Sequence, residues 1–408
     1  MTPPGASVPS EKQDLRALII LLSVVFLNIA GFGVVIPLLP FFGKAFDAPA
    51  WQIALLFSMF SFGQFLGEPF WGRLSDRVGR RPVLIVTIAV SALAYVALAF
   101  SPNILFAFVA RFAGGFFAGN ISTLQGCMAD ITPPEKRAGR MGVMGSAFSM
   151  GFMTGPALGG LLAQPSLGPI GFQLPLFAAA ALGLASAAGV FFFVRETRPG
   201  TPDVRPRGRQ VALREAFAHP VIARVLIISF VIVSGFAGIE ATYGLWTAAK
   251  FGWGPREIGL AFMVIGVIGA FSQGIATGWL VARFGEPRVL IAGLCLMFVG
   301  MLVQFTSQVP AQAVLGLAIV GFGQSICFPN LVGLISKSTP PDRQGEMLGL
   351  NMSNNALARI GGPIYAGQLF SLVSPGAPFA LTAILIVPAV ILALQVIKRL
   401  PHGQPPAS

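Results

Sequence analysis

Three charged residues in this chain of 408 amino acids lie within long apolar runs: Arg111, Glu240 and Arg359. An ionisable side chain near the centre of a bilayer costs about 2.5–3.5 kcal/mol on insertion scales, so we expect such residues to have functions. A carboxyl group in a low-dielectric cavity holds a proton more readily than one in water. Glu240 is therefore predicted to load and release protons.

Each of these residues has an alternative interpretation. Glu240 could form a structural ion pair or hold a cationic substrate. Arg111 is predicted to be a coupling or pairing charge because it lies well inside its apolar run, and the alternative is a side chain that reaches back to the membrane surface. For Arg359, a packing role and a cavity role are equally open.

The residue sets that ATPases and metal proteins need are absent from the sequence. No Gly-x-x-x-x-Gly-Lys-Ser/Thr occurs, which argues against ATP hydrolysis by this chain, and no His-Glu-x-x-His occurs. Cys127, Cys295 and Cys327 lie in apolar runs outside any Cys-x-x-Cys, and the histidines, His219 and His402, are far apart. We therefore expect no catalytic residues, no cofactor and no metal site, and we do not expect an enzyme.

The elements that must position these charges are membrane-spanning helices. Hydrophobic residues make up 55% of the chain and charged residues only 10%, whereas a soluble domain carries about 25% charged residues. A helix needs about 20 residues to cross the hydrocarbon layer, so the length suffices for about a dozen crossings. Apolar runs predict twelve spans, at residues 17–42, 51–72, 83–101, 104–131, 140–163, 172–194, 222–248, 257–282, 288–306, 311–336, 346–370 and 378–398.

Positive charges are distributed unevenly over the loops between these spans. With the N-terminus placed in the cytoplasm, 22 of the 27 Lys and Arg residues fall in cytoplasmic segments and 3 on the opposite side. Cytoplasmic loops carry an excess of Lys and Arg, so both termini are predicted to be cytoplasmic. Topology thereby explains the net charge of +12, and nucleic acid is not an expected partner.

The two halves of the chain repeat one another. The segment that begins at Gly72 after the second span resembles the one that begins at Gly278 after the eighth, an offset of 206 residues. A Gly-Pro pair at Gly155 in the fifth span matches another at Gly362 in the eleventh, an offset of 207. These matches predict two six-helix units, residues 1–194 and 222–408, joined by a cytoplasmic linker at 195–221. In transporters built this way the site lies between the halves, near the middle of the membrane.

Four motifs carry a resemblance to a known family. Gly-Arg-Leu-Ser-Asp-Arg-Val-Gly-Arg-Arg follows the second span, Gly-(five residues)-Pro-Leu-Leu-Pro lies in the first, Arg-Phe-Ala-Gly-Gly in the fourth and Gly-Phe-Met-Thr-Gly-Pro-Ala-Leu-Gly-Gly in the fifth. Together they resemble the major facilitator superfamily, most closely its twelve-span drug:proton antiporters, which include tetracycline and multidrug exporters. The first motif implies a cytoplasmic gate formed by Gly72, Asp76, Arg77, Gly79, Arg80 and Arg81. The last implies an antiporter motif formed by Gly151, Gly155, Pro156, Gly159 and Gly160.

The resemblance implies an all-α membrane protein whose twelve transmembrane helices form two pseudo-symmetric six-helix bundles. It implies proton-coupled antiport that exports a hydrophobic or amphipathic small molecule, such as a tetracycline-like antibiotic, by alternating access. We expect a monomer in the lipid bilayer of the cytoplasmic membrane of a bacterium, with protons and the substrate as its partners. An exporter of a metabolite or sugar and an uptake symporter stay open as alternatives, and a non-transporting membrane receptor is a more distant one.

The resemblance also implies which spans form the cavity. In this family spans 1, 4, 7 and 10 line it and spans 2, 5, 8 and 11 flank it, and aromatic and amide side chains there suit a bulky amphipathic substrate. The chain departs from tetracycline exporters at Asn28 and Ala94, where they carry acids, and it has no His in the eighth span. The predicted substrate-binding residues are Asn28, Phe32, Gln64, Asn120, Phe236, Tyr243, Trp246, Gln324, Asn330, Asn355 and Arg359.

Overall fold

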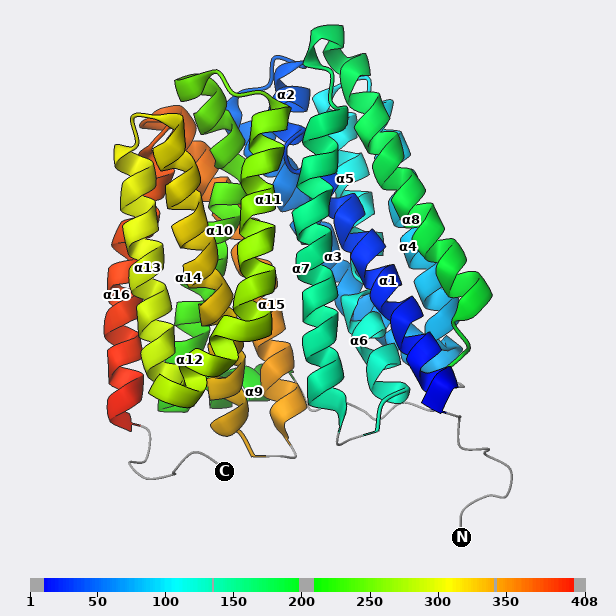
Figure 1. Cartoon of the computed structure of the whole chain (residues 1–408), viewed down its shortest axis with the longest axis vertical. Coiled ribbons are helices and arrows are strands. Elements are labelled where there is room, and N and C mark those ends of the chain that lie inside the picture. The colour runs from blue at the N-terminus through cyan, green and yellow to red at the C-terminus, as the bar shows by residue number, and fades with distance from the viewer. Residues whose placement is uncertain (1–10, 134–135, 198–208, 341–342, 400–408) are drawn as a thin grey trace.

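The computed structural model describes residues 11–133, 136–197, 209–340 and 343–399, and this part of the chain is helical without a strand (Figure 1). The helices of the first half are α1 (Glu11–Val35), α2 (Leu39–Lys44), α3 (Ala50–Val78), α4 (Arg80–Ala99), α5 (Ile104–Ala118), α6 (Ile121–Asp130), α7 (Arg137–Leu162) and α8 (Gln173–Phe193). Those that follow are α9 (Arg209–Ala218), α10 (Pro220–Phe251), α11 (Pro255–Phe271), α12 (Thr277–Phe284), α13 (Glu286–Thr306), α14 (Pro310–Lys337), α15 (Gln344–Leu372) and α16 (Ala377–Arg399).

Nine helical stretches in the described residues are long and apolar enough to cross a membrane, judged by length and composition. The predicted spans outside these nine coincide with α7, α11–α12 and α15, and among the nine α3 has the lowest mean hydropathy, 1.3. α3, α7, α11 and α15 are the helices that pack against each other between the two halves of the chain. α3, α7 and α15 are less apolar than most other spans because part of their surface faces protein instead of lipid. α11 falls outside the nine because the π-helical turn ends it after 17 residues.

Two of the predicted spans are interrupted. The span predicted at 104–131 breaks at Gly119 and Asn120, between α5 and α6. A Cβ atom at position 119 would lie 2.5 Å from the backbone nitrogen of Glu68, so α3 packs closely against the break. The span predicted at 257–282 contains a π-helical turn at Ser272–Ala276. The predicted linker also holds a short helix, α9, in its described part.

The two halves have the same internal packing. In the first half α1 packs on α7 and α8, and α4 on α5 and α8; in the second half α10 packs on α15 and α16, and α13 on α14 and α16. Gly79 and Gly285 have φ angles of +104° and +80°, directly before α4 and α13. Glycine adopts a positive φ without the steric cost that other residues incur. The same turn therefore connects equivalent helices, and the backbone repeats as the sequence does.

The halves contact each other along α7 from Gly160 to Gly145 and separate beyond it, toward one end of the molecule. We call the end at which α1 begins and α16 ends the terminal face, which lies at the bottom of Figure 1. Near the opposite face, a Cβ atom on Gly160 in α7 would lie 2.4 Å from the carbonyl oxygen of Pro255 in α11. Gly142 lies on the same side of α7 toward the terminal face, and no described atom lies within 4 Å of a Cβ built there.

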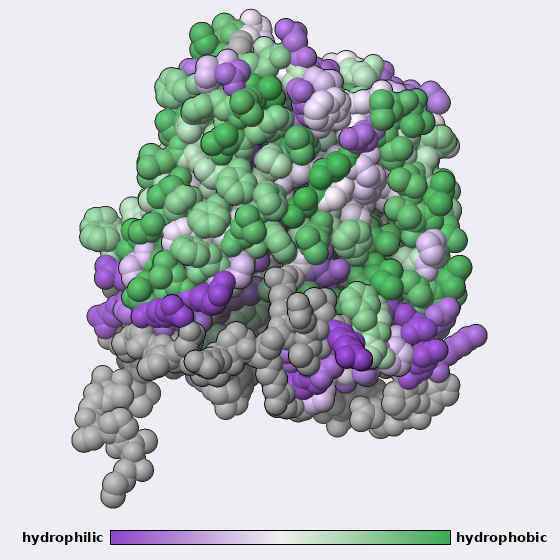
Figure 2. All heavy atoms as spheres, turned by 180° about the vertical axis from the view of Figure 1, so that it is seen from behind, coloured by the Kyte–Doolittle hydropathy of each residue, from purple (hydrophilic) through white to green (hydrophobic). Residues whose placement is uncertain are grey.

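The outer surface is apolar over most of its height. On the face that Figure 2 displays, hydrophobic side chains cover most of the height and a band of hydrophilic residues lies near the terminal face. Large apolar side chains are exposed on many helices; Phe192 at the end of α8 is 72% exposed. Exposed apolar area of this extent marks a surface that contacts lipid or protein instead of water.

Candidate functional site

A cavity of about 100 Å³ lies between the two halves and is lined by residues from both. The first half contributes side chains from α1 and from α3 to α7, and the second contributes from α10 and α15. The sequence identified every charged residue of this lining. The predicted residues that line the cavity are Asn28, Phe32, Gln64, Arg111, Glu240 and Arg359.

Glu240 and Arg359 form an ion pair on the wall that the second half provides. Nη1 of Arg359 in α15 donates to Oε2 of Glu240 in α10 at 3.4 Å. The Glu240 side chain is 5% exposed, and its other oxygen, Oε1, has no hydrogen-bond partner among the described residues. A buried carboxylate with an unsatisfied oxygen carries a desolvation cost that a proton or a second cation would relieve.

Arg111 lies on the wall that the first half provides and has a different environment. Its Nε donates to the carbonyl oxygen of Leu56 at 3.2 Å, and its Cζ lies 4.4 Å from the centroid of the Phe60 ring. The residue is only 4% exposed, and no carboxylate of the described chain pairs with it. One cation–π contact and one neutral hydrogen bond compensate a buried guanidinium only in part.

Sequence reasoning missed most of the aromatic and apolar lining. Phe57, Phe60 and Ser61 line the cavity together with Gln64, all from α3. They precede Gln64 by seven, four and three residues, which places all four on one helix face, so this helical pattern could have identified them. Tyr95 in α4 and Phe148 in α7 also line the cavity, and nothing in their sequence surroundings distinguishes them.

Four predicted amide residues lie outside the cavity lining. Asn120 is fully buried at the break between α5 and α6, where it donates to Thr87 Oγ1 at 3.0 Å and accepts from Asn28 at 3.5 Å. Asn330 donates to a carbonyl of its own helix, and Asn355 accepts a hydrogen bond from Ser229 at 2.7 Å. Gln324 is half-buried in α14. The contacts that the structure gives these asparagines are packing contacts, and their role in binding stays a prediction.

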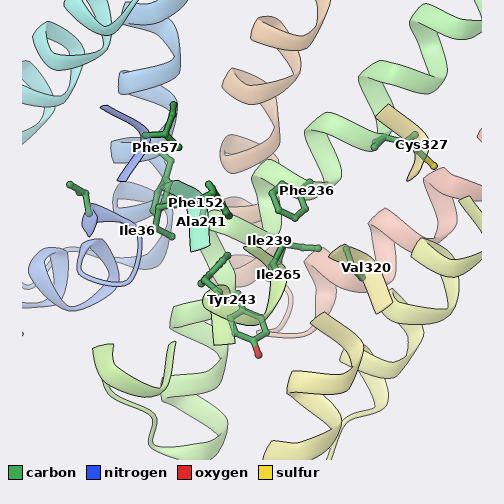
Figure 3. Packing of buried hydrophobic residues seen from close by; sticks show 14 of the residues in the cluster. Ile36, Phe57, Phe152, Phe236, Ile239, Ala241, Tyr243, Ile265, Val320 and Cys327 are labelled. Carbon is green, nitrogen blue, oxygen red and sulfur yellow. The ribbon is translucent and has the colours of Figure 1, made fainter. Parts of the chain in front are cut away.

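Three predicted aromatic residues also lie outside the lining. Phe236, Tyr243 and Trp246 of α10 belong to the hydrophobic core. Figure 3 places Phe236 and Tyr243 among Ile239, Ile265 and other apolar side chains. Tyr243 and Trp246 pack against each other with ring centroids 5.8 Å apart. Their place in the core arises because α10 is buried on all sides over residues 232–247, which the composition of one helix does not reveal.

The predicted gate residues lie near the terminal face, between α3 and α4. Arg80 pairs with Asp130 at the end of α6 at 2.6 Å and with Asp76 at 3.4 Å. The carboxylate of Glu196 accepts hydrogen bonds from the backbone nitrogens of Arg80 and Arg81, at 2.8 and 3.2 Å, and so caps α4. Asp76 and Asp130 belong to the first half and Glu196 to the start of the linker, so none of these partners lies in the second half. Gly72 and Arg77 lie on α3, and Gly79 makes the turn.

The predicted antiporter motif separates into two glycine faces on α7. Cβ atoms on Gly151, Gly155 and Gly159 would lie within 2.0–2.8 Å of backbone oxygens of α1, inside the first half. Gly160 instead contacts α11 of the second half, and the carbonyl oxygen of Pro156 would lie 2.3 Å from a Cβ on Gly259 of α11. The motif therefore allows α7 to approach α1 and α11 at the same time.

Comparisons with known proteins agree with this architecture. The family model of the Major Facilitator Superfamily matches residues 21–276 and 225–408. The class C tetracycline resistance protein of Escherichia coli is 29% identical over 368 residues, 87% of this chain and 90% of that protein. Multidrug resistance protein 2 of Bacillus subtilis (strain 168) is 28% identical over 372 residues, 89% and 91% of the two chains. The quinolone resistance protein NorA of Staphylococcus aureus is 26% identical over 351 residues, 85% and 88%.

Solved structures share the fold. A bacterial homologue of the human lysosomal transporter Spinster, in an inward-facing and unoccupied conformation, matches with a TM-score of 0.80 at 16% identity and covers 98% of this chain and 100% of that one. The human organic anion transporter MFSD10 matches with a TM-score of 0.70 at 24% identity, over 96% and 100% of the two chains.

Proposed function

The chain belongs to the Major Facilitator Superfamily, and on that basis we propose that it exports a hydrophobic or amphipathic small molecule in exchange for protons. The family consists of membrane transporters, so the chain is a multi-pass transporter of the cell membrane and not an enzyme. The tetracycline, multidrug and quinolone resistance proteins among its relatives support a drug as the substrate. We propose that it works as a monomer.

The observation that carries the proposal is the Glu240–Arg359 pair in the cavity between the halves. A proton on Glu240 would neutralise the carboxylate, weaken its attraction to Arg359 and satisfy the oxygen that lacks a partner. A substrate bound beside the pair would change the same balance of charge. Proton release and substrate binding are thereby linked through one group, as antiport requires.

The packing between the halves supports alternating access. We assign the terminal face to the cytoplasm, because most Lys and Arg residues lie in the segments on that side. The halves touch from the opposite face down to Gly145 and separate toward the terminal face, so this conformation is the one that would load substrate from the cytoplasm. Rocking of residues 1–194 against residues 222–408 would then open the opposite side, and the gate at Gly72–Arg81 would hold the cytoplasmic side shut.

The cavity volume of about 100 Å³ is smaller than the 300–1,000 Å³ of typical small-molecule sites. A drug-sized molecule could therefore enter only if the halves move apart beyond their present separation. We accordingly propose that substrate binding itself widens the cavity on the cytoplasmic side.

The test is proton-driven drug uptake into everted membrane vesicles and growth inhibition of an efflux-deficient host across a panel of antibiotics. Glu240→Gln keeps the size of the side chain and removes its titration, so we expect loss of exchange by at least tenfold with normal expression. Glu257→Gln is the matched control, because Glu257 caps the start of α11 outside the cavity lining. Undiminished efflux by Glu240→Gln would refute the proton role.

A double variant separates the carrier role from a purely structural ion pair. If Glu240 only neutralises Arg359, removing both charges in Glu240→Gln with Arg359→Gln should restore transport. If Glu240 carries protons, the double variant should stay inactive. If expression of the wild-type chain leaves growth inhibition by every compound in the panel unchanged, the result would contradict drug export and favour a metabolite or sugar exporter.

A further inference from the structure

We propose that the substrate is a zwitterion with an aromatic body, whose anionic group binds Arg111 and whose cationic group binds Glu240. This inference rests on the proposed export function and specifies its substrate class. It follows from two buried charged groups on facing halves of one cavity, each incompletely partnered, with an aromatic wall around them.

Arg111 is the first of these groups. The described chain gives it one hydrogen bond, from Nε to Leu56, and the face of the Phe60 ring. A guanidinium has five N–H donors in a planar fork that matches a carboxylate. A buried cation without a carboxylate is costly, and a bound anion would supply the partner that the protein does not. Arg111 therefore selects for an anionic group on the first half of the cavity.

Glu240 is the second group. Arg359 uses only Oε2 of its carboxylate, and Oε1 has no partner among the described residues although the side chain is buried. An ammonium group placed at Oε1 would satisfy this oxygen and add a second ion pair to the carboxylate. Glu240 comes from α10 and Arg111 from α5, so the two binding groups belong to different halves of the molecule.

The side chains around these groups suit a flat aromatic body once the halves have moved apart to admit it. Phe57, Phe60, Tyr95 and Phe148 line the same cavity, and their rings can stack on or edge against an aromatic ligand. The charges of the lining are two guanidiniums and one carboxylate. A zwitterion leaves the net charge of the cavity unchanged. A dianion or a dication that spans Arg111 and Glu240 would instead place one of its charges against a protein group of the same sign.

The sign of the coupling also requires the cationic group. An ammonium group and a proton both neutralise Glu240, so they compete for it, and competition for one site produces exchange. An anion at Arg111 leaves Glu240 free to stay protonated, so an acid without an amine would bind and not displace the proton. The amine therefore couples the substrate to the proton gradient, and the acid contributes affinity.

The experiment uses four forms of one quinolone that differ only at their charged ends. They are norfloxacin with its carboxylate and piperazine amine, its ethyl ester with the amine alone, its N-acetyl derivative with the acid alone, and the N-acetyl ester with neither. Binding to the purified full chain is measured by equilibrium dialysis with quinolone fluorescence. Proton release on binding is measured with a pH dye in weak buffer. Export is measured in the vesicles described above.

We expect norfloxacin to bind the wild-type chain at least tenfold more tightly than its ethyl ester. Of the four forms, we expect only norfloxacin and the ethyl ester, which carry the free amine, to release protons on binding. In Arg111→Gln the ester should bind as in the wild type, while norfloxacin should bind no better than the ester. Dependence of the loss on the ligand's carboxylate identifies a direct contact, since a structural defect would weaken both compounds equally. The wild-type series needs no variant, so it decides the question even if Arg111→Gln does not fold.

Two results would overturn the inference. One is equal binding of norfloxacin and its ester by the wild-type chain, and the other is proton release by the N-acetyl acid. If the ester is nevertheless exported against a proton gradient, the export function stands and only the zwitterion assignment fails. If the four forms bind in the expected order but none is exported, the assignment stands and the export function fails.

Discussion

Arg111 shows how a single side chain is held at the boundary between protein and cavity. Its Nε bonds a backbone carbonyl, and its planar guanidinium lies over Phe60. Both contacts depend on features that arginine has and lysine lacks, namely an Nε–H donor and a flat delocalised cation. The position therefore requires the shape of the guanidinium in addition to its charge.

Arg111→Lys is expected to lower the rate of transport at least tenfold while leaving the melting temperature in detergent within a few degrees of the wild-type value. The charge remains, but the ammonium group cannot keep both contacts and so lies in a different place. Vesicle transport and thermal unfolding of the purified protein are the two measurements. Full activity of the lysine variant would show that charge alone is sufficient.

Two ion pairs at equivalent positions in the two halves differ in their burial. Arg80–Asp130 in the first half and Lys337–Glu286 in the second join the start of one helix to the end of another at equivalent positions, with their signs exchanged. The Arg80 side chain is 9% exposed, whereas that of Lys337 is 69% exposed. Solvent screens the exposed pair much more than the buried one.

Asp130→Asn is therefore expected to destabilise the protein by about 2 kcal/mol, because it leaves a buried arginine with a weaker partner. Lys337→Gln should cost less than about 1 kcal/mol. Thermal unfolding in the same detergent compares the two variants directly. Equal shifts in melting temperature would contradict the prediction that the buried ion pair contributes more to stability than the exposed one.

Helix α7 illustrates what an element contributes beyond its residues. Its glycines at 151, 155 and 159 fit against α1, and Gly160, one residue further, fits against α11 in the other half. The first set fixes α7 within its own bundle, while Gly160 makes a contact that must break if the halves rock. Glycine spacing in the sequence indicates close packing, but it does not tell which neighbour each glycine meets.

Gly160→Ala is expected to lower transport severalfold and to lower the free energy of unfolding by about 1–3 kcal/mol, because its Cβ would overlap the Pro255 carbonyl of α11. Gly142→Ala is the matched control on the same helix, since a Cβ there meets no described atom within 4 Å. Vesicle transport and melting temperature are measured for both. A control variant as impaired as Gly160→Ala would place the effect in the helix and not in the contact between halves.

In the molecule as a whole, the two halves are equivalent bundles that enclose a shared cavity between them. The equivalent helices pack in the same pairs, and only α3, α7, α11 and α15 make the main contacts between halves. Because these contacts involve two pairs of helices, the bundles can rotate against each other without disturbing either core. The face of the molecule to which the cavity opens then depends on which ends of these four helices are in contact.

A bulky wedge on the closed side should shift this equilibrium. In a chain whose three cysteines are replaced by alanine, Gly142→Cys is expected to react with a membrane-impermeant maleimide in everted vesicles. Adding Gly160→Trp should force α7 from α11 near the opposite face, bring the terminal ends together and slow the labelling severalfold. Labelling that is as fast with the wedge as without it would argue against rigid rocking of the halves.

Composition and spacing along the chain are sufficient to predict the membrane class, the helical fold, the repeat and the charged residues of the cavity. A charge within an apolar run is conspicuous whatever its neighbours are, so Arg111, Glu240 and Arg359 could be identified. The tertiary structure decided that Glu240 pairs with Arg359, that Phe57 lines the cavity and that Tyr243 does not. Those facts depend on how helices are rotated and on which helix lies beside which, and packing between distant segments fixes both.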